Sequence, residues 1–337
     1  MAFIYNYSLK SINTFGIDVK ATQFASFSDI ESLRELLKLS ANTNKLVIGG
    51  GSNLLFTSDF TGTVLQNSIK GIEVTSKDAD NVYVKVGAGE IWHDLVMYCV
   101  TNNLQGIENL ALIPGCVGAA PMQNIGAYGV ELKDIFYELS AIEINTGNER
   151  KFSNQDCAFG YRESVFKNEL KNKYVIVSVT LQLNSKPHYK ISYGNLKEEI
   201  DKYGETNLSM ATIAKAVISI RSSKLPDPKE IGNAGSFFKN PEILLSQFDE
   251  LKINFPTIVG YPTTNDKIKV AAGWLIEQAG WKGKTFENKY GVHKNQALVL
   301  VNYGGANGQE ILELSSKIID SIFQKFGISL EREVNIY

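Results

Sequence analysis

The stretch from Ile113 to Gly129 reads IPGCVGAAPMQNIGAYG and lies in a run without any charged residue, between Glu108 and Glu131. A run of this length could span a bilayer, but its prolines and glycines would interrupt a helical hydrogen-bond ladder that lipid cannot repair. We therefore interpret the stretch as a buried, glycine-rich loop. Small residues let the main chain approach a flat or anionic ligand, and successive N–H groups can converge on phosphate oxygens. On composition alone, tight packing between two layers explains the glycines about equally well.

A second glycine-rich segment, Gly49-Gly50-Gly51-Ser52-Asn53, stands between two apolar runs, Leu46 to Ile48 and Leu54 to Phe56. This pattern predicts a strand, a glycine turn and a second strand. Consecutive glycines permit positive φ and bare amides, while the Ser52 hydroxyl and the Asn53 amide suit a diphosphate. Taken alone, a structural turn is the more common explanation of such a run.

Two further segments begin or end like nucleotide-binding motifs, and we reject both. After a strand predicted at Val82 to Val86, Gly87-Ala88-Gly89 starts like a dinucleotide fingerprint, but Trp92 occupies the place of the third glycine. Gly283-Lys284-Thr285 ends like a phosphate loop, but Gln278 stands where the first glycine belongs.

Length and composition exclude several classes of protein. The 337 residues can form two or three domains, and a net charge of −2 leaves no electrostatic footprint for nucleic acid or an anionic membrane. The start, MAFIYNYSLK, lacks the basic and apolar regions of a secretory signal, so we expect a cytoplasmic protein. No metal-ligand spacing relates the cysteines and histidines, so we expect reduced thiols and no metal. These residues are Cys99, Cys116, Cys157, His93, His188 and His293.

Local patterns predict the main helices and strands. Ser28 and Glu31 have the spacing of a capping box for a helix that runs to about Leu39. Asn307 and Glu310 similarly cap a long amphipathic helix. Further helices are expected at 91–103, from Met210 to before Leu225, and at 270–279. Further strands are expected at 139–144, 174–183 (with Val175, Val177, Val179, Leu181 and Leu183 on one face), 297–302 and 328–337.

Seven motifs occur along nearly the whole chain. In order they are NTFGI (13–17), GGGSNLL (49–55), the loop from IPG to AYG (113–129), GYRES (160–164), KLPDPK (224–229), NAGSFFKNP (233–241) and LEREV (330–334). On these motifs the chain resembles the UDP-N-acetylenolpyruvoylglucosamine reductase family, flavin enzymes of bacterial cell-wall synthesis. Tyr193-Gly194-Asn195-Leu196, and a long segment that includes Tyr261 and Lys269, resemble the family's first type, which closes a tyrosine loop over the substrate.

The resemblance implies an α+β fold of the PCMH/VAO type, in which a two-lobed flavin-binding region is followed by a separate α+β C-terminal substrate-binding domain. We expect the first lobe at residues 1–70, joined by the C-terminal strand at 328–337, and the second lobe at 71–220. The substrate-binding domain is expected at 221–327. The rigid, turn-prone Leu225-Pro226-Asp227-Pro228 independently favours a boundary near this point.

The cofactor implied by the resemblance is FAD, held without a covalent link, because neither glycine loop contains the histidine through which some relatives attach the flavin. Cys116 stands where relatives often carry a hydroxyl residue. The implied FAD-binding residues are Gly49, Gly50, Gly51, Ser52, Asn53, Pro114, Gly115, Gly118, Ala119, Gln123, Asn124, Gly126, Ala127, Tyr128 and Arg221. The implied substrate-binding residues are Tyr193, Lys224, Asn240, Tyr261 and Lys269, although a lysine is usually solvent-facing and a tyrosine is more often half-buried packing.

The reaction implied by the resemblance is reduction of the enolpyruvyl ether of UDP-N-acetylglucosamine to UDP-N-acetylmuramate. NADPH first passes a hydride to FAD and then leaves the shared site. Arg162 would hold the substrate carboxylate, Ser236 would protonate the carbanion and Glu333 would polarise the developing enol.

Without the resemblance, the same residues have plainer interpretations. Arg162 would be a partner of Glu163 or of a surface carboxylate, and Ser236 would be a turn or cap serine. Glu331 and Glu333 would share one face of a strand as solvated edge charges, so only the match to the motif favours Glu333.

Two alternative functions remain open from the sequence. One is an FAD oxidase or dehydrogenase of the same superfamily that acts on another alcohol or sugar. The other is a flavin- or UDP-sugar-binding protein without turnover, which the joint presence of Arg162, Ser236 and Glu333 disfavours. We expect small-molecule partners, NADPH and the enolpyruvyl substrate, with no nucleic acid and no membrane, and we expect a monomer.

Overall fold

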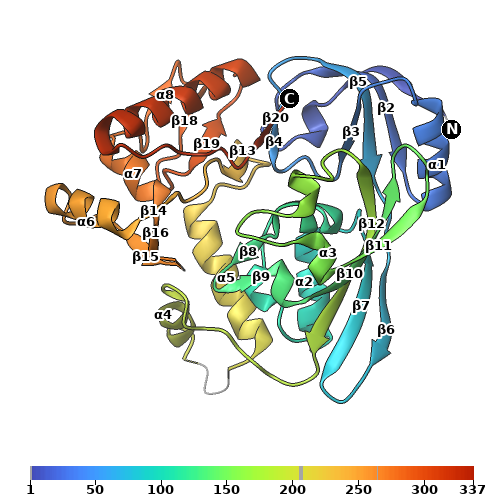
Figure 1. The fold of residues 1–337 in the computed structure, drawn as a ribbon, viewed down its shortest axis with the longest axis horizontal. Coiled ribbons are helices and arrows are strands. Elements are labelled where there is room, and N and C mark those ends of the chain that lie inside the picture. The colour runs from blue at the N-terminus through green and yellow to red at the C-terminus, as the bar shows by residue number, and fades with distance from the viewer. Residues whose placement is uncertain (1, 205–207, 264) are drawn as a thin grey trace. The chain divides into compact units, whose positions relative to one another are not determined.

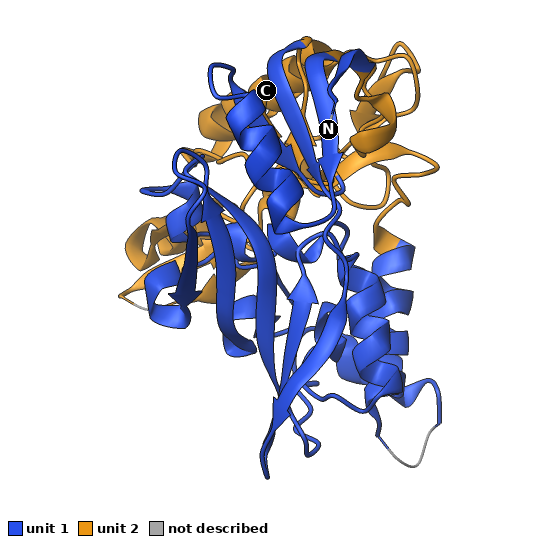
Figure 2. Cartoon of the chain, turned by 90° about the vertical axis from the view of Figure 1, so that its right-hand side faces the viewer, with its two compact units in different colours: residues 1–7, 21–50, 60–223 blue, residues 8–20, 51–59, 224–337 orange. Residues whose placement is uncertain are grey.

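The computed structural model describes residues 2–204, 208–263 and 265–337. The chain divides into two compact units, each assembled from segments distant in sequence (Figure 2). Unit 1 comprises residues 1–7, 21–50 and 60–223, and unit 2 comprises residues 8–20, 51–59 and 224–337. The three-part division at 70/71 and 220/221 stays a prediction.

Unit 1 contains a small sheet with the strand order β1-β2-β5-β3, in which β5 pairs in parallel with both β2 and β3. The strands are β1 (Ile4–Ser8), β2 (Lys20–Phe27), β3 (Lys45–Ile48) and β5 (Phe60–Asn67). Helix α1 (Ile30–Leu39) packs Leu33, Leu36 and Leu37 against this sheet. The predicted helix and the predicted strand at 46–48 are confirmed.

The predicted cap of α1 was wrong by one residue. Asp29, not Ser28, is the N-cap, and its carboxylate accepts the Ser32 N–H at 2.7 Å. Ser32 Oγ in turn accepts the Asp29 N–H at 3.3 Å, so Ser32 takes the place expected for Glu31. A charged carboxylate is a stronger acceptor for these amides than a serine hydroxyl, which favours the later start.

A larger antiparallel sheet with the order β11-β10-β12-β7-β6 forms the rest of the framework of unit 1 (Figure 1). The strands are β6 (Ile72–Lys77), β7 (Asn81–Gly87), β10 (Phe136–Glu143), β11 (Glu149–Ser153) and β12 (Tyr174–Asn184). Helices α2 (Trp92–Thr101) and α5 (Met210–Lys224) bury apolar side chains in its core. The strands predicted at 82–86, 139–144 and 174–183 and both helices are confirmed.

The central strand β12 contributes side chains to two hydrophobic cores. Val175 and Val177 pack with α1, whereas Val179, Leu181 and Leu183 pack with α2 and α5. The short elements of unit 1 are α3 (Asn154–Cys157), α4 (Leu196–Asp201), β8 (Gly126–Ala127), β9 (Val130–Glu131), and the 3-10 turns η2 (Glu108–Leu110), η3 (Val117–Ala119), η4 (Pro121–Gln123), η5 (Leu132–Asp134) and η6 (Val165–Lys167).

Unit 2 contains two small antiparallel sheets with the orders β13-β19-β18-β17 and β14-β16-β15. Their strands are β13 (Gly232–Ser236), β14 (Glu242–Leu244), β15 (Gly260–Pro262), β16 (Lys267–Val270), β17 (Thr285–Phe286), β18 (Tyr290–Val292) and β19 (Val299–Asn302). The helices are η1 (Lys10–Ile12), α6 (Leu245–Asn254), α7 (Ala272–Gln278) and α8 (Gly308–Phe326). The predicted cap of α8 is confirmed, since Asn307 and Glu310 hydrogen-bond each other's backbone N–H at 2.9 and 2.7 Å.

Two elements of unit 2 differ from the prediction. Val270 belongs to β16, opposite Gly260 of β15, so α7 starts only at Ala272. The final strand is short: β20 (Asn335–Ile336) pairs in parallel with β4 (Leu54–Leu55). In the described part of the chain, the only strand-like pairing of the residues just before β20 is an isolated bridge between Phe238 and Arg332. Two backbone hydrogen bonds flank this bridge, Lys239 N–H to Glu331 O and Glu333 N–H to Phe237 O, and they do not extend into a longer ladder.

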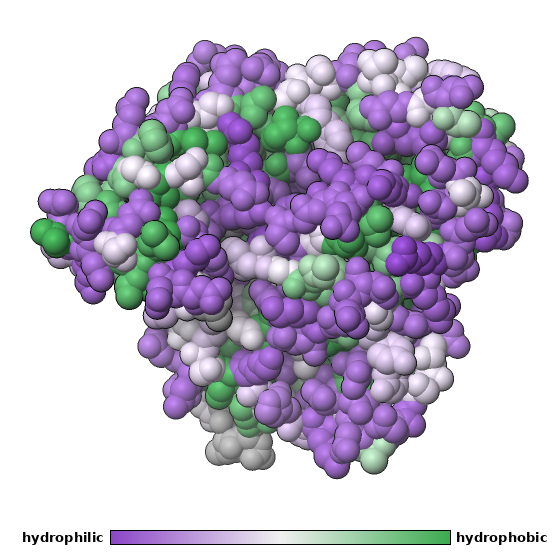
Figure 3. All heavy atoms as spheres, in the orientation of Figure 1, coloured by the Kyte–Doolittle hydropathy of each residue, from purple (hydrophilic) through white to green (hydrophobic). Residues whose placement is uncertain are grey.

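Apolar side chains are exposed around α6 in unit 2. Leu244, Leu245 and Ile253 keep 57%, 41% and 80% of their surface accessible. Apolar atoms accordingly gather at the left edge of Figure 3, where Figure 1 places α6, while most of the face shown is polar.

Candidate active site

The two glycine-rich segments meet within unit 1. A Cβ placed on Gly50 would lie 3.7 Å from the Cα of Gly115, an ordinary contact. A Cβ on Gly49 would lie 2.9 Å from the Cβ of Cys116, which is too close. The Gly50 N–H hydrogen-bonds the Cys116 sulfur, and burial raises the pKa of this thiol. The packing explanation therefore accounts for Gly49, while Gly50 and Gly115 form a surface without side chains.

The backbone of the loop from Ile113 to Gly129 is attached to the turn between β7 and α2. Val117 N–H donates to Glu90 O and Gly118 N–H donates to Ala88 O, both at 2.8 Å. A Cβ on Gly118 would lie 2.6 Å from the Cβ of Ala88, so packing also explains this glycine. The expectation of a buried loop was wrong in part: Pro114, Ala119, Met122 and Gly129 are exposed, because η3 and η4 satisfy several amides locally.

Asn124 fastens the loop to the GYRES segment. It is fully buried at φ +44°, and its Nδ2 donates to Glu131 Oε2 at 3.1 Å and to Gly160 O at 3.0 Å. Its Oδ1 accepts the Lys133 N–H at 3.0 Å. The side chain is thus used inside the protein, and no surface of this residue is accessible.

Arg162 lies over the end of the same loop. The residue adopts φ +55°, and its Nη2 donates to Gly126 O at 2.8 Å. A Cβ on Gly126 would lie 2.9 Å from Cγ of Glu131 and 3.0 Å from Val130 O, which explains why a small residue stands there. Ser164 Oγ donates to Met122 O at 2.6 Å and so joins the two segments a second time. The sequence suggested Glu163 as a partner of Arg162. The structure places Oε1 of Glu163 3.8 Å from Nζ of Lys167.

Arg221 reaches the same region from α5. Its Nε donates to Leu112 O at 3.2 Å, and within the described part of the chain no carboxylate pairs with it. Burial lowers the pKa of this guanidinium, Arg162 lowers it further, and Tyr128 opposes both effects. A half-buried guanidinium whose charge no carboxylate compensates is suited to an anionic ligand.

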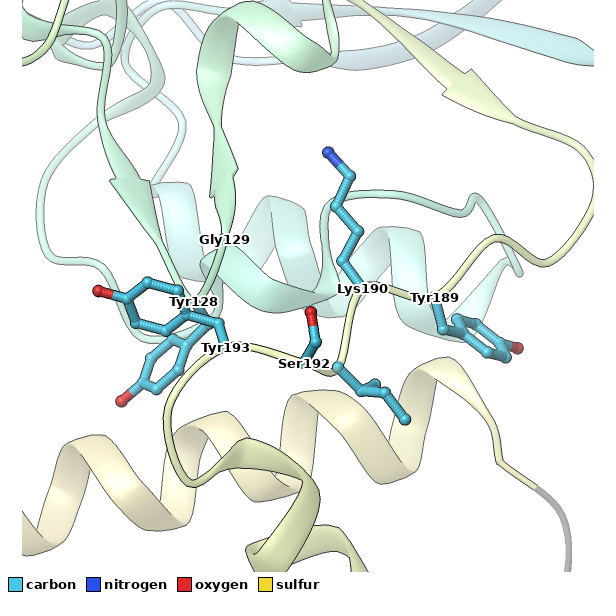
Figure 4. A pocket seen from close by; sticks show the side chains of 7 residues that line it. Tyr128, Gly129, Tyr189, Lys190, Ser192 and Tyr193 are labelled. Atoms are coloured by element: carbon cyan, nitrogen blue, oxygen red, sulfur yellow. The ribbon is translucent and has the colours of Figure 1, made fainter. Parts of the chain in front are cut away.

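An open pocket of about 400 Å³ adjoins the end of the loop (Figure 4). The rings of Tyr128 and Tyr193 meet edge to face with centroids 6.3 Å apart, and Tyr189 points away from this pair. Sequence reasoning chose Tyr193 but missed Tyr189, Lys190 and Ser192, although they lie in the same short segment. Lys190 pairs with Asp134 at 3.2 Å.

In unit 2, the backbone of Glu333 contacts the side chain of Asn53 and the residue that follows Ser236. Ser236 is exposed at the end of β13, after a bulge in which Gly235 adopts φ +70°. The next residue, Phe237, is fully buried, and its carbonyl accepts the Glu333 N–H at 2.8 Å. Asn53 Nδ2 donates to Glu333 O at 3.3 Å.

The first of the two C-terminal glutamates, Glu331, has a buried lysine as its partner. Glu331 Oε1 lies 2.6 Å from Nζ of Lys239, a buried lysine that sequence reasoning did not single out. The Lys239 N–H also donates to Glu331 O at 2.9 Å. Glu331 is therefore held in an ion pair with Lys239.

The remaining candidates in unit 2 lie in three places. Tyr261 and Lys269 stand directly opposite each other on β15 and β16, and Nζ of Lys269 is 3.8 Å from Glu242 Oε1. Asn240 Oδ1 accepts the Ala272 N–H at 2.9 Å and so supports the start of α7. Lys224 is exposed at the end of α5.

Of the expected FAD-binding residues, unit 2 contains Gly51, Ser52 and Asn53, and unit 1 contains all the others. A Cβ on Gly51 would lie 2.0 Å from Ile12 O, and its φ of +60° also requires glycine. In the described part of the chain, no helix is long and apolar enough to cross a membrane, and no group of three or more metal-ligating side chains is found.

Comparisons with known proteins agree with this arrangement. Residues 227–337 match the model of the UDP-N-acetylenolpyruvoylglucosamine reductase C-terminal domain, and residues 21–153 match an FAD binding domain. The UDP-N-acetylenolpyruvoylglucosamine reductase of Flavobacterium johnsoniae is 50% identical over 98% of both chains. That of Pseudomonas syringae pv. tomato is 47% identical over 98% of this chain and 97% of its own. The chain belongs to this reductase family.

Membership of the reductase family makes the chain an FAD-dependent oxidoreductase and confirms the resemblance drawn from the seven motifs. The crystal structure of UDP-N-acetylenolpyruvylglucosamine reductase (MurB) from Thermus caldophilus has a TM-score of 0.69 at 22% identity, over 100% of this chain and 98% of that one. The 6-hydroxy-D-nicotine oxidase of Arthrobacter nicotinovorans has a TM-score of 0.54 at 14% identity, over 97% and 86%. These two likenesses concern the fold, and they confirm the predicted flavin-binding α+β class.

Proposed function

We propose that the protein reduces enolpyruvyl-UDP-N-acetylglucosamine to UDP-N-acetylmuramate with NADPH as the hydride donor, in the cytoplasm and as a step of peptidoglycan precursor synthesis. One observation supports this most strongly: the surface of Gly50 and Gly115, free of side chains, occurs in the same unit as the half-buried Arg221, whose charge no described carboxylate compensates. When bound, FAD supplies the relay that carries a hydride from NADPH to the enolpyruvyl double bond.

The residues of unit 1 fit a non-covalent FAD. Bare backbone at Gly50 and Gly115 permits close approach of a diphosphate or a flat ring, and Arg221 supplies positive charge. Gly49, Gly118 and Gly126 contribute indirectly, since a side chain there would collide with Cys116, Ala88 or Glu131 and displace the loop. Asn124 has a supporting role, because its side chain joins the loop to Glu131, Gly160 and Lys133.

Arg162 is proposed to hold the substrate carboxylate. Its guanidinium is oriented by the Gly126 carbonyl at 2.8 Å, which fixes the planar donor fork. A carboxylate next to the reduced carbon receives negative charge as the hydride arrives, and a permanently charged fork stabilises that charge without accepting a proton.

Ser236 is proposed to give its proton to the carbon that becomes a carbanion, and Glu333 to polarise the developing enol. The exposed position of Ser236 at the end of β13 leaves its hydroxyl accessible to a substrate. The bond from Glu333 N–H to Phe237 O holds the glutamate beside the residue that follows Ser236. The match of Glu333-Val334 to the LEREV motif is what selects Glu333 over Glu331 for this role.

The substrate contacts proposed for Tyr193, Lys224, Asn240, Tyr261 and Lys269 have unequal support. Tyr193 lines the pocket of unit 1 with Tyr128. Tyr261 and Lys269 present an aromatic ring and an ammonium group side by side, which suits a uridine and its diphosphate. Lys224 is accessible, whereas Asn240 Oδ1 already accepts the Ala272 N–H and leaves its amide hydrogens for a ligand.

The test is anaerobic absorbance of the purified protein. We expect bound oxidised flavin, bleaching on addition of NADPH, and return of the oxidised spectrum on addition of enolpyruvyl-UDP-N-acetylglucosamine. Bleaching without reoxidation would reject this substrate and favour an oxidase or dehydrogenase with another acceptor. A flavin that NADPH does not bleach would favour a binding protein without turnover, and the lack of any flavin binding would contradict the proposed cofactor site.

A further inference from the structure

The chain enters the glycine-rich loop through a residue in an unfavourable conformation. Leu112 adopts φ +58°, a left-handed conformation that is rare for a branched side chain. Its N–H donates to Nδ1 of His93 at 3.0 Å, and its carbonyl accepts Nε of Arg221 at 3.2 Å. Side chains from α2 and α5 thus hold both backbone polar groups of this one residue.

The segment just before Leu112 is anchored in a similar way. Trp92 Nε1 donates to Leu110 O at 3.0 Å, and Asn109 Nδ2 donates to Tyr128 O at 2.8 Å. These bonds hold residues 109 and 110, but the backbone direction into Pro114 depends on the dihedral angles of Leu112. His93 is the contact on its N–H side.

We propose that His93 is a positioning residue for the flavin site. Its neutral imidazole accepts the Leu112 N–H and thereby sets the path of the loop that carries Gly115 and Gly118. This role rests on the proposed function, because it takes that loop as part of the FAD site. His93 touches neither reacting atoms nor, in this proposal, the flavin itself.

The hydrogen bond requires one particular form of the imidazole. Nδ1 can accept only when the proton is on Nε2, and a protonated ring has donors on both nitrogens. Burial lowers the pKa of His93, Arg221 on α5 lowers it further, and Asp94 on α2 raises it. The neutral form is therefore favoured near neutral pH, and protonation at lower pH would place two donors face to face.

The experiment measures the FAD dissociation constant of the apo-protein by quenching of flavin fluorescence between about pH 5 and 8, the range in which histidine titrates. In His93→Asn the side-chain Oδ1 can replace Nδ1 as the acceptor, and it does not titrate. His93→Leu removes the acceptor. His188→Asn is the matched control, because His188 is exposed on another segment.

We expect the wild type and His188→Asn to bind FAD about tenfold more weakly at the acid end of the range, the size of effect that loss of one buried hydrogen bond produces. His93→Asn should bind at pH 7.5 like the wild type and stay constant across the range. His93→Leu should bind about tenfold more weakly throughout. Long-range nitrogen–proton correlation NMR of the wild type should show the proton of His93 on Nε2.

Wild-type affinity in His93→Leu at pH 7.5, an unchanged acid loss in His93→Asn, or a proton on Nδ1 would each overturn the role of His93 and leave the flavin site intact. If the wild type binds no FAD at any pH, the proposed function fails and the role of His93 fails with it. If His93→Leu does not fold, the comparison of His93→Asn with the wild type still decides.

Discussion

Polar residues of the candidate site divide between those used by the protein and those available to a ligand. Every polar atom of the Asn124 side chain bonds to neighbouring segments. Arg221, in contrast, donates one hydrogen bond to Leu112 O and has no carboxylate partner among the described residues. A residue type alone does not reveal this difference, since both residues are common in binding sites and in buried networks.

Arg162→Lys should slow the second half-reaction, flavin reoxidation by the enolpyruvyl substrate, by at least about tenfold. An ammonium is a point charge and cannot replace both the fork on the carboxylate and the bond to Gly126 O. Anaerobic stopped-flow absorbance measures this step, with flavin content as the check that the loop is still formed. Unchanged turnover would remove Arg162 from the catalytic set.

Ser236→Ala should leave flavin reduction by NADPH nearly intact and slow reoxidation by about 10² to 10⁴, the usual contribution of a positioned acid. The two half-reactions are followed separately by stopped-flow absorbance. Ser58→Ala, an exposed serine of the same unit, is the control. Equal loss of both half-reactions in Ser236→Ala would contradict the role of proton donor.

At the scale of elements, the main helices and several strands follow local pattern, and the helix ends follow capping chemistry. The cap of α8 was predictable because Asn307 and Glu310 satisfy each other's N–H within one turn. The start of α7 was not predictable, because Val270 pairs with Gly260 of the neighbouring strand, ten residues earlier in the chain. A helical pattern cannot show that a neighbouring strand already uses the same backbone.

Asn307→Ala should lower the free energy of unfolding by about 1 kcal/mol, because it removes the side-chain acceptor for the Glu310 N–H. Urea denaturation followed by circular dichroism measures the change. Asn307→Asp should retain most of the stability, since a carboxylate can accept the same bond. A loss in Asn307→Asp as large as that in Asn307→Ala would show that the cap does not contribute through this acceptor.

At the scale of the whole molecule, each unit joins segments that are far apart in the chain. In unit 2, β20 pairs with β4, and Asn53 bonds to Glu333 O, so the C-terminal residues complete a structure begun by residues 51–59. In unit 1, the core of the larger sheet includes residues from β7 to α5. Removal of the last few residues would therefore also remove hydrogen-bond partners of residues 53–55.

The stability of the whole molecule should fall as the pH drops through about 6.5, the ordinary pKa of histidine. Burial lowers the pKa of His93 and of His293, whose Nδ1 is buried without a partner among the described residues. A lowered folded pKa means that the unfolded chain binds the proton more readily, so the contribution is complete above 6.5 and is lost below it. Glu108, whose pKa burial raises, opposes the trend at lower pH.

Urea denaturation at about pH 5.5 and 7.5 tests this expectation. Each variant is compared with the wild type, so that the contributions of the other titratable groups cancel. The loss of unfolding free energy between the two pH values should be smaller in the double variant His93→Asn, His293→Asn than in the wild type. His188→Asn should keep the wild-type loss. An identical loss in all three proteins would show that the buried histidines do not carry the pH dependence.

The sequence by itself determined the main helices, several of the strands, the α+β flavin-binding class and the family. Hydrophobic periodicity and capping act within a few residues, and the motifs are specific as an ordered set. Tertiary structure decided which glycines serve packing and which leave bare backbone, since Gly118 depends on Ala88 and Gly50 on Gly115. It also placed Glu331 in an ion pair with Lys239, and it limited the final strand to Asn335–Ile336. Each of these features depends on a contact with residues distant in sequence, and a local sequence pattern cannot predict which distant residues will be in contact.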